Sequence, residues 1–293
     1  RLHAVSAQTF TDMSRLDQDL LVTRMVGRSI RDIFHYTPRP LGQPALEITG
    51  LFGPGLAEPA NLTVAQGEVV ALFGLVGAGR TELLKLIYGA ARSQAGRIKV
   101  AGREAFVSSP GSAIRRGIVL CPEDRKKEGV IAVRSVKENI NISVRRLMTW
   151  FGFINERKEL ENAGKFARQL DIKTPSLSRL VRDLSGGNQQ KVVLARWLSE
   201  KVKVILLDEP TRGIDVGAKS EIYSIISQLA AEGMAVLVVS SDLPEVLGIA
   251  DRIIVMRQGR LHPPVGREEA SEEKLLRLAL PVVDHNHDRS TIA

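Results

Sequence analysis

The period of apolar and polar positions changes several times along the chain, and each change predicts a different kind of element. From Ala45 onward, short runs such as ALEITGLF, ANLTVAQGEVVALF and GRIKVAGREAFV are β-rich and separated by glycines. They predict a β-rich layer. Later in the chain, the continuous apolar runs in VKVILLDEP, GMAVLVVSSD and RIIVMRQG alternate with helical segments, which is typical of strands buried on both faces of a parallel sheet.

The middle of the chain follows a helical period instead. Apolar residues recur there at spacings of three and four, which predicts amphipathic helices. The two sets are Val136, Ile140, Val144, Leu147 and Phe151, and Leu160, Ala163, Ala167 and Leu170. A helical insertion within an α/β core is the simplest assembly of these parts.

The two ends of the chain differ from this core. Residues 1 to about 43 begin with helix-like content and pass through HYTPRPLGQP, whose prolines and glycine predict a linker. The last residues, PVVDHNHDRSTIA, are polar, and we expect them to be loosely ordered. Because the first residue is Arg1 rather than methionine, we expect an excised fragment or a processed chain.

Composition narrows the classes of protein that fit. The 293 residues are 44% hydrophobic and 25% charged, as in ordinary globular proteins, and no apolar run approaches the ~18 residues of a membrane-spanning helix. The one cysteine, Cys121, excludes internal disulfides and fits a reducing compartment, so we expect a cytoplasmic protein. The net charge of +8 would suit an anionic partner, but no dense basic block with aromatic residues is present, and we expect no nucleic-acid partner.

The stretch GLVGAGRTEL, Gly74–Leu83, is close to the consensus of a phosphate-binding loop but has no lysine at the position where the consensus has one. The glycine spacing of G-x-x-x-x-G-K-S/T is kept, but Arg80 stands at the lysine position. The stretch connects a predicted strand, EVVALF, to a predicted helix, TELLKLIYG, as a phosphate cradle requires. Arginine keeps the charge but positions phosphate less well than a compact ammonium, so nucleotide binding should survive better than catalysis. A plain structural turn is the alternative.

Two further features carry candidate chemistry. In VILLDEP, Asp208 and Glu209 follow a hydrophobic strand, where one carboxylate can hold Mg²⁺ and the next can orient or deprotonate an attacking water. A solvated turn is the alternative. In LSGGNQQKVVLARWL, Ser185 and two glycines precede a predicted helix and could bind an anion at its N-terminus. A helix cap with a flexible turn is the alternative there.

Taken in order, these motifs resemble those of ATP-binding cassette transporter ATPases. A Walker A-like loop is followed by LSGGN with QQK, the signature motif, and by LLDEPTRGID, the Walker B motif and D-loop. The resemblance covers residues 44 to 265. GLVGAGRTEL, PEDRKKEG and SSDLPEVLGIADR narrow it to the second nucleotide-binding domain of tandem ATPase subunits of bacterial monosaccharide importers, of the ribose, galactose, arabinose and xylose type. RMVGR resembles the end of the first domain.

The resemblance implies a fold, a domain division and partners. The expected fold is α/β, a P-loop NTPase (RecA-like) core with an antiparallel β layer and an α-helical subdomain at about 124–182. Residues 1–43 would be the remnant of a preceding nucleotide-binding domain with its linker, 44–280 the domain itself and 281–293 a polar tail. The expected partners are the first nucleotide-binding domain or a second copy, membrane permease subunits and, indirectly, a periplasmic sugar-binding protein. The chain would be peripheral on the inner face of the membrane.

The resemblance also assigns site residues for ATP and Mg²⁺. The nucleotide-binding residues would be Gly74, Gly77, Ala78, Gly79, Arg80, Thr81, Glu82 and Glu123. Thr81 and Asp208 would hold Mg²⁺, and Glu209 and Ser241 would be catalytic. In the family, two domains enclose ATP head to tail, so Ser185, Gly186, Gly187 and Asn188 would reach the partner's γ-phosphate.

Three positions depart from the family pattern. Glu123 replaces the usual glutamine, Ser241 replaces the switch histidine, and Arg80 replaces the lysine. A serine hydroxyl does not titrate near neutral pH and cannot act as the charged phosphate sensor that a histidine can. We therefore expect the chain's own site to bind nucleotide but to hydrolyse it slowly or not at all, while its signature motif serves the partner's ATP.

Alternative functions and interpretations remain open at this point. A regulatory nucleotide-binding module without turnover fits the altered residues, and a soluble ATPase of DNA repair shares the motifs but would carry a long coiled-coil insertion. The charge run DRKKEG is interpreted as a solvated face. Phe52 could stack on adenine or pack in the β layer, and Trp150 and Trp197 are expected to pack in the core or between domains. His35, His262, His285 and His287 are interpreted as surface residues.

Overall fold

A computed structural model describes residues 34, 36–150 and 153–281. The expectations for the preceding-domain remnant fall almost entirely outside these residues, as do those for the polar tail and for Phe151. No helix within the described ranges is long and apolar enough to cross a bilayer.

A largely parallel sheet forms the centre of the molecule. It has seven strands in the order β12-β11-β3-β10-β9-β6, with β13 pairing beside β11. Strands β11, β3, β10, β9 and β6 are parallel, and β12 and β13 are antiparallel to β11. The bounds are β3 (Val69–Phe73), β6 (Ile118–Cys121), β9 (Val204–Asp208), β10 (Ala235–Ser240), β11 (Arg252–Arg257), β12 (Arg260–Leu261) and β13 (Val265–Gly266). The three late apolar runs are therefore buried parallel strands, as predicted.

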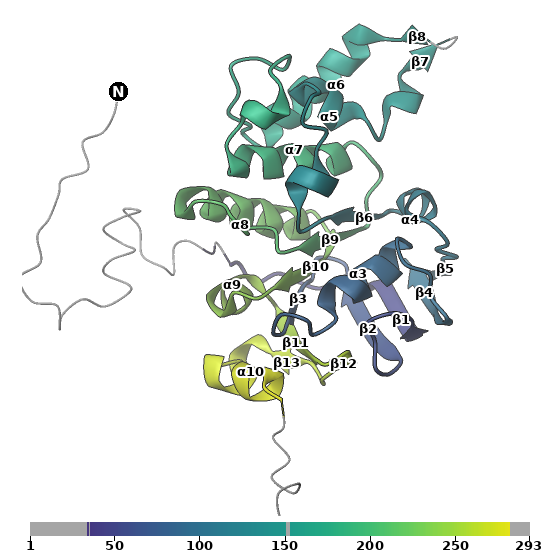
Figure 1. Cartoon of the computed structure of the whole chain (residues 1–293), viewed down its shortest axis with the longest axis vertical. Coiled ribbons are helices and arrows are strands. Elements are labelled where there is room, and N and C mark those ends of the chain that lie inside the picture. Colours follow the sequence, from purple (N-terminus) through teal and green to yellow (C-terminus); the bar gives the residue numbers. More distant parts are fainter. Residues whose placement is uncertain (1–33, 35, 151–152, 282–293) are drawn as a thin grey trace, which may run out of the picture.

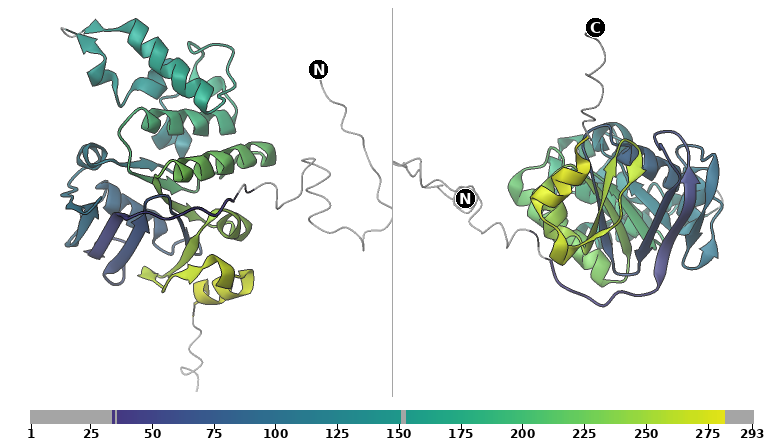
Figure 2. Two further views of the ribbon diagram at one scale, coloured as in Figure 1. Left: turned by 180° about the vertical axis from the view of Figure 1, so that it is seen from behind. Right: turned by 90° about the horizontal axis from the view of Figure 1, so that it is seen from below.

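The β-rich run after Ala45 forms a second, antiparallel sheet in the order β2-β1-β4-β5. Its strands are β1 (Pro44–Phe52), β2 (Ala60–Ala65), β4 (Ala95–Val100) and β5 (Arg103–Glu104). Alternate residues of β2 are buried, as expected for a sheet with one face on a core. The view from below in Figure 2 shows these strands standing beside the central sheet.

The helices complete the layers. They are α3 (Arg80–Tyr88), α4 (Pro110–Arg116), α5 (Val136–Asn141), α6 (Glu156–Gln169), α7 (Gly186–Leu198), α8 (Val216–Ala231), α9 (Leu243–Ile249) and α10 (Glu272–Ala279). Helices α5, α6 and α7 lie at one end of the molecule with the short hairpin β7 (Thr149–Trp150) and β8 (Phe153–Ile154), and α10 lies at the other end (Figure 1).

One predicted helix is much shorter than its apolar period suggests. The pattern beginning at Val136 continues beyond Asn141, but α5 ends there and is followed by a 3₁₀ turn, Arg145–Leu147. Asn141 uses its side-chain amide to donate to the Lys137 carbonyl (2.9 Å) and to the Glu159 carbonyl of α6 (2.8 Å). This cross-link turns the chain toward α6, and Leu147 is left 68% exposed. The extension of the helix beyond Asn141 was wrong.

The two faces of the central sheet pack against different helices. Along β9, Val204 and Leu206 belong to the apolar cluster that contains α3 and the antiparallel sheet. Ile205 and Leu207 belong to the cluster that contains α7 and α8. Because successive residues of a strand point to opposite faces, α3 and α7 lie on opposite sides of the sheet.

Candidate nucleotide-binding site

The Gly74–Arg80 connection has the geometry that a phosphate cradle needs. A Cβ on Gly74 would lie 2.3 Å from the Met256 carbonyl oxygen, so only glycine fits beside β11. Gly77 and Gly79 have φ values of +82° and +99°, which favour glycine. A Cβ on Gly77 would meet nothing within 4 Å, so open space lies beside this part of the loop. Ala78 is buried, whereas Val76 at the tip of the loop is 95% exposed.

Helix α3 begins directly after this loop and presents free backbone groups to it. Gly79 is the N-cap residue and supplies no side-chain hydrogen bond. The first N–H groups of a helix have no partner within the helix, and the helix dipole makes this end attractive to anions. Glu82 lies in the first turn with an exposed side chain and makes no contact that identifies it as a ligand.

Thr81 and Asp208 lie side by side where α3 begins and β9 ends. Asp208 is 3% exposed and makes a side-chain hydrogen bond with Thr81. Burial raises the pKa of Asp208 to about 6, with Thr81 and Arg80 opposing the rise. Its Oδ1 atom is buried without a hydrogen-bond partner in the described structure. Such an orphaned oxygen needs an explanation, and a cation ligand is one.

The pair fits Mg²⁺. A hydroxyl and a carboxylate oxygen are hard ligands, and Mg²⁺ typically takes one or two protein ligands together with substrate phosphates. No group of three or more His, Cys, Asp or Glu side chains in the described ranges could hold a metal by itself. A metal at Thr81 and Asp208 would therefore depend on a bound phosphate.

Arg80 and Glu209 form an ion pair in the middle of the site. Arg80 Nη1 lies 3.2 Å from Glu209 Oε1, and their side chains are only 9% and 11% exposed. Burial lowers the pKa of Arg80, while Glu209 and Asp208 oppose that change. Glu209 has φ +45°, a left-handed conformation that is uncommon for a residue with a side chain, and its N–H donates to the Val239 carbonyl (2.9 Å). The proposed base is thus held by the residue that replaces the lysine.

Ser241 follows β10 with an exposed side chain. The residue before it, Ser240, is fully buried and donates to Glu245 Oε2 (2.5 Å). Thr211, shortly after Glu209, donates to Glu245 Oε1 (3.1 Å). Glu245 therefore links the loop that carries Glu209 to the loop that carries Ser241. Burial raises the pKa of Glu245 to about 7, although both hydroxyls lower it.

Sequence reasoning did not find this link. Glu245 was not singled out because a carboxylate on a short helix is normally solvent-exposed. The signal available was its place among apolar neighbours in LPEVLGI, where α9 has a buried face.

Glu123 follows β6 and forms an ion pair with Arg212 of the loop after Glu209. It makes no recorded contact with the Gly74–Glu82 loop in the described structure. The next residue but one, Arg125, donates from Nη1 to the Arg212 carbonyl (2.7 Å) and from Nη2 to the Gly213 carbonyl (3.1 Å). The interpretation of DRKKEG as a solvated face was therefore wrong for Arg125, because two backbone carbonyl groups accept hydrogen bonds from its guanidinium. Lys126 and Lys127 are exposed, as predicted.

The signature residues sit at the start of α7. Ser185 is the N-cap residue, but its hydroxyl does not cap the helix. It accepts instead from Asn188 Nδ2 (2.9 Å), and Asn188 Oδ1 accepts from the Lys173 N–H (2.7 Å). The side-chain cap of the alternative interpretation is therefore absent. Gly186 and Gly187 pack against Gly213 and Ala218 rather than against the phosphate loop.

The structure therefore brings together only part of the predicted set. The loop from Gly74 to Thr81 meets Asp208 and Glu209. The signature motif has no recorded contact with that loop in the described ranges, because α3 and α7 lie on opposite faces of the central sheet.

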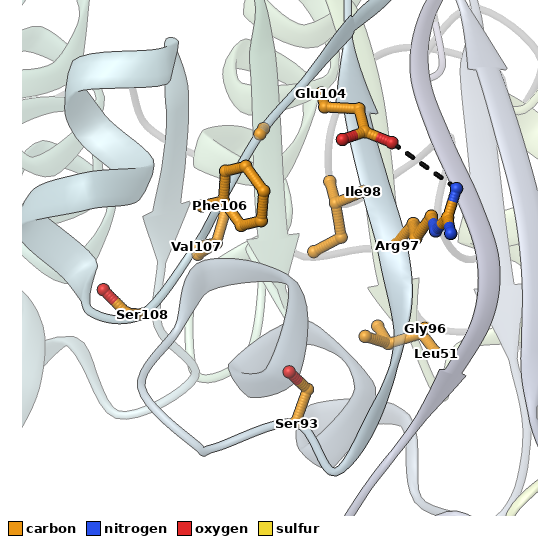
Figure 3. A pocket seen from close by; sticks show the side chains of 10 residues that line it. Leu51, Ser93, Gly96, Arg97, Ile98, Glu104, Phe106, Val107 and Ser108 are labelled. Atoms are coloured by element: carbon orange, nitrogen blue, oxygen red, sulfur yellow. Dashed lines mark ion pairs between the residues drawn. The ribbon is translucent and has the colours of Figure 1, made fainter.

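A cavity of about 470 Å³ lies away from this site. Figure 3 shows it lined by Ile98, Phe106 and Val107, with the exposed ion pair of Arg97 and Glu104 at 3.7 Å along one side. A Cβ on Gly89, the residue that ends α3, would lie 2.8 Å from Val107. The cavity is therefore near the end of α3 remote from the phosphate loop. Phe52 is partly buried against the α3 cluster, which favours packing over stacking. Trp197 is buried, as expected.

Comparison with known proteins agrees with this geometry. The family model described as ABC transporter matches residues 57–212. The arabinose import ATP-binding protein AraG of Mannheimia succiniciproducens is 56% identical over 274 residues, covering 93% of this chain and 55% of that protein. AraG of Pseudomonas syringae pv. syringae is 55% identical, covering 94% of this chain and 54% of that protein. The chain thus spans about half the length of these relatives.

Solved structures share the fold. A nucleotide-free ATP-binding cassette from an ABC transporter has a TM-score of 0.70 at 22% identity, covering 82% of this chain and 100% of that chain. Another ATP-binding cassette of an ABC transporter has a TM-score of 0.68 at 24% identity, with 82% and 100% covered. The predicted fold class is confirmed. Because the family model matches more than half of this chain, the chain belongs to the ABC transporter family, and it has the fold of that family's ATP-binding cassettes.

Proposed function

We propose that the chain is the second nucleotide-binding domain of an importer's ATP-binding subunit, which energises uptake of a monosaccharide. The names of the curated relatives favour arabinose, and the match to about half of their length favours one domain of a tandem protein. On this proposal residues 1–43 belong to the preceding domain and its linker, 44–280 form the domain with a helical subdomain at about 124–182, and 281–293 form a tail.

The observation that carries nucleotide binding is the unpartnered Oδ1 of Asp208 beside Thr81 at the start of α3. The N–H groups of Gly77, Gly79, Arg80 and Thr81 would bind the phosphates, while the Ala78 N–H donates within the loop to the Leu75 carbonyl (3.0 Å), and the Arg80 side chain would add positive charge. Magnesium, held by Thr81 and Asp208, would neutralise phosphate charge when bound.

Hydrolysis at this site should be slow because of the Arg80–Glu209 ion pair. Glu209 Oε1 faces the guanidinium of Arg80 at 3.2 Å, so this oxygen is engaged by Arg80 rather than free to orient a water. Ser241 cannot supply the positive charge of a histidine at the other side of the phosphates. The site would bind ATP and retain it.

The signature motif should act on a second nucleotide. Ser185 and Gly186 lie on the opposite side of the central sheet from α3, so they cannot close over the chain's own phosphate loop without unfolding the core. They would face the phosphate loop of the preceding domain, or of a second copy. Membrane permease subunits and a periplasmic sugar-binding protein would complete the importer at the cytoplasmic face of the membrane.

Steady-state ATPase measurements on the isolated chain and on the tandem protein test this division. The isolated chain should bind Mg-ATP in calorimetry yet turn over slowly, and the Glu209→Gln change should leave turnover of the tandem protein within about threefold of wild type. Rapid turnover by the isolated chain that Glu209→Gln abolishes would contradict the proposal.

A regulatory module without any catalytic contribution is the second candidate, and the same Arg80–Glu209 pair favours it. The Ser185→Asp change separates the two. Aspartate is a good N-cap residue, so α7 should persist, but its charge would repel a γ-phosphate. Lost turnover in the tandem protein supports the shared site, and unchanged turnover supports the regulatory module.

The sugar can be tested in vesicles that contain the complete importer. ATP-dependent uptake of labelled arabinose should exceed uptake of ribose, galactose and xylose. Equal uptake of all four sugars, or preference for another, would contradict the proposed substrate.

A further inference from the structure

The segment after Glu123 forms a π-helical turn, Arg125–Gly129, that separates one basic residue from the others. Asp124 caps the turn, accepting from the Lys127 N–H (3.1 Å). Lys126 and Lys127 extend into solvent. Arg125 instead contacts the loop after Glu209, where its two terminal nitrogens donate to consecutive carbonyl groups, those of Arg212 and Gly213.

The same guanidinium lies against the signature motif. A Cβ on Gly186 would be 2.6 Å from Arg125 Nη2 and 3.2 Å from the Gly213 carbonyl oxygen. Arg125 therefore occupies the space between the first residue of α7 and the loop after Glu209. Arg212, on the loop after Glu209, in turn forms an ion pair with Glu123. Each of the two loops therefore contributes an arginine that contacts the other loop. Burial lowers the pKa of Arg125, consistent with its place among these segments.

We propose that Arg125 is a positioning residue that fixes Ser185 and Gly186 relative to the loop 209–215, and so sets how the signature motif meets the partner's nucleotide. The inference rests on the proposed function of that motif. A guanidinium can hold two carbonyl groups at once through its planar fork, whereas a lysine offers one compact donor. Displacement of a positioned group by about 1 Å can cost about a hundredfold in rate.

The test uses steady-state ATPase kinetics of the intact tandem protein. Arg125→Gln should lower kcat at least about tenfold while KM for ATP changes less than about threefold, because positioning is lost and nucleotide binding is kept. Arg125→Lys should recover only part of the rate. Lys126→Gln removes the same charge from the same turn at an exposed position and should stay within about twofold of wild type.

A double-mutant cycle checks the contact itself. Gly186→Ala should displace the guanidinium and lower kcat in the wild-type background, and it should lower kcat by a smaller factor when Arg125 is already glutamine. Additive losses would overturn the inference. So would a loss of kcat in Arg125→Gln that merely follows a fall in Tm, because that is the behaviour of a purely structural residue.

The Ser185→Asp variant distinguishes failure of this inference from failure of the proposed function. If Ser185→Asp leaves turnover unchanged, the signature motif serves no nucleotide and both ideas are wrong. If Ser185→Asp abolishes turnover while Arg125→Gln behaves as Lys126→Gln does, the shared site stands and the positioning role of Arg125 is wrong.

Discussion

At the scale of single residues, the chemistry of the site depends on what each carboxylate faces. Asp208 has a buried oxygen without a partner, Glu209 faces Arg80, and Glu245 faces two hydroxyl groups. These three carboxylates thus have three different surroundings: Asp208 is the proposed cation ligand, Glu209 is an ion-pair partner, and Glu245 on α9 links two loops.

The ion pair predicts the effect of restoring the lysine. Arg80→Lys should increase ATP turnover of the isolated chain at least about tenfold, or about 1.4 kcal/mol of barrier, because a shorter ammonium releases Glu209. The turnover is measured as the steady-state rate of phosphate release. Glu209→Gln should remove the gain, and Arg97→Lys, at an exposed ion pair, should give none. A rate equal to wild type would show that Glu209 is not limited by Arg80.

Glu245 predicts a pH dependence of stability. Its folded-state pKa, about 7, is above its ordinary value of 4.5, so its contribution to the free energy of unfolding is full below pH 4.5 and is lost as the pH rises through about 7. The loss is on the order of 3 kcal/mol. Urea unfolding between about pH 5 and pH 8 should show wild type losing stability relative to Glu245→Gln.

The control for this series is Glu161→Gln, at an exposed position on α6. It should leave the wild-type pH profile unchanged. Parallel profiles for wild type and Glu245→Gln would show that Glu245 is already ionised in the folded protein at low pH.

At the scale of elements, the strand-to-helix connection combines two different needs for glycine. Gly74 is required by the Met256 carbonyl, a backbone atom of β11, whereas Gly77 is required only by its own positive φ. A side chain at Gly74 would clash with the Met256 backbone and force the loop away from β11. A side chain at Gly77 would meet open space, so it would cost only the local backbone strain of a positive φ.

These needs predict unequal effects of alanine. Gly77→Ala should lower the free energy of unfolding by about 1–2 kcal/mol, as should Gly50→Ala, which has φ +61° and open space far from the loop. Gly74→Ala should cost more than either and abolish binding of a fluorescent ATP analogue. Thermal unfolding and fluorescence titration measure the two effects. Equal costs for Gly74→Ala and Gly77→Ala would contradict the close approach to Met256.

Elements whose burial follows a simple period could be predicted from the sequence. The strands ending at Phe73, Asp208 and Ser240 and the helix from Arg80 to Tyr88 follow from continuous apolar runs and glycine punctuation. The end of α5 could not be predicted, because it depends on Asn141 bonding to a residue of α6 distant in the chain. The roles of Arg125 and Glu245 were missed for the same reason, since tertiary contacts decide whether a charge is solvated.

At the scale of the whole molecule, the central sheet separates the two halves of the proposed nucleotide site. The phosphate loop and the signature motif lie at the starts of helices on opposite faces of the sheet, so one copy does not bring its own two halves together. On the proposed function, a second molecule or the preceding domain, arranged head to tail with this one, would supply the other half of each site.

This arrangement predicts ATP-dependent association of the isolated chain. With saturating Mg-ATP, the apparent mass in sedimentation should shift toward a dimer, and Ser185→Asp should prevent the shift without weakening nucleotide binding. Lys126→Gln should associate like wild type. A dimer that forms equally well without nucleotide, or that Ser185→Asp leaves intact, would contradict a composite site.

Cys121, the only cysteine of the sequence, lies at the end of β6, fully buried, and burial raises the pKa of its thiol to about 12. A thiol in that state is inert to alkylating reagents until the sheet opens, because only the solvated thiolate reacts. The chain thus contains its own reporter group. The rate of Cys121 modification measures how often the edge of the central sheet separates, and it needs no engineered label.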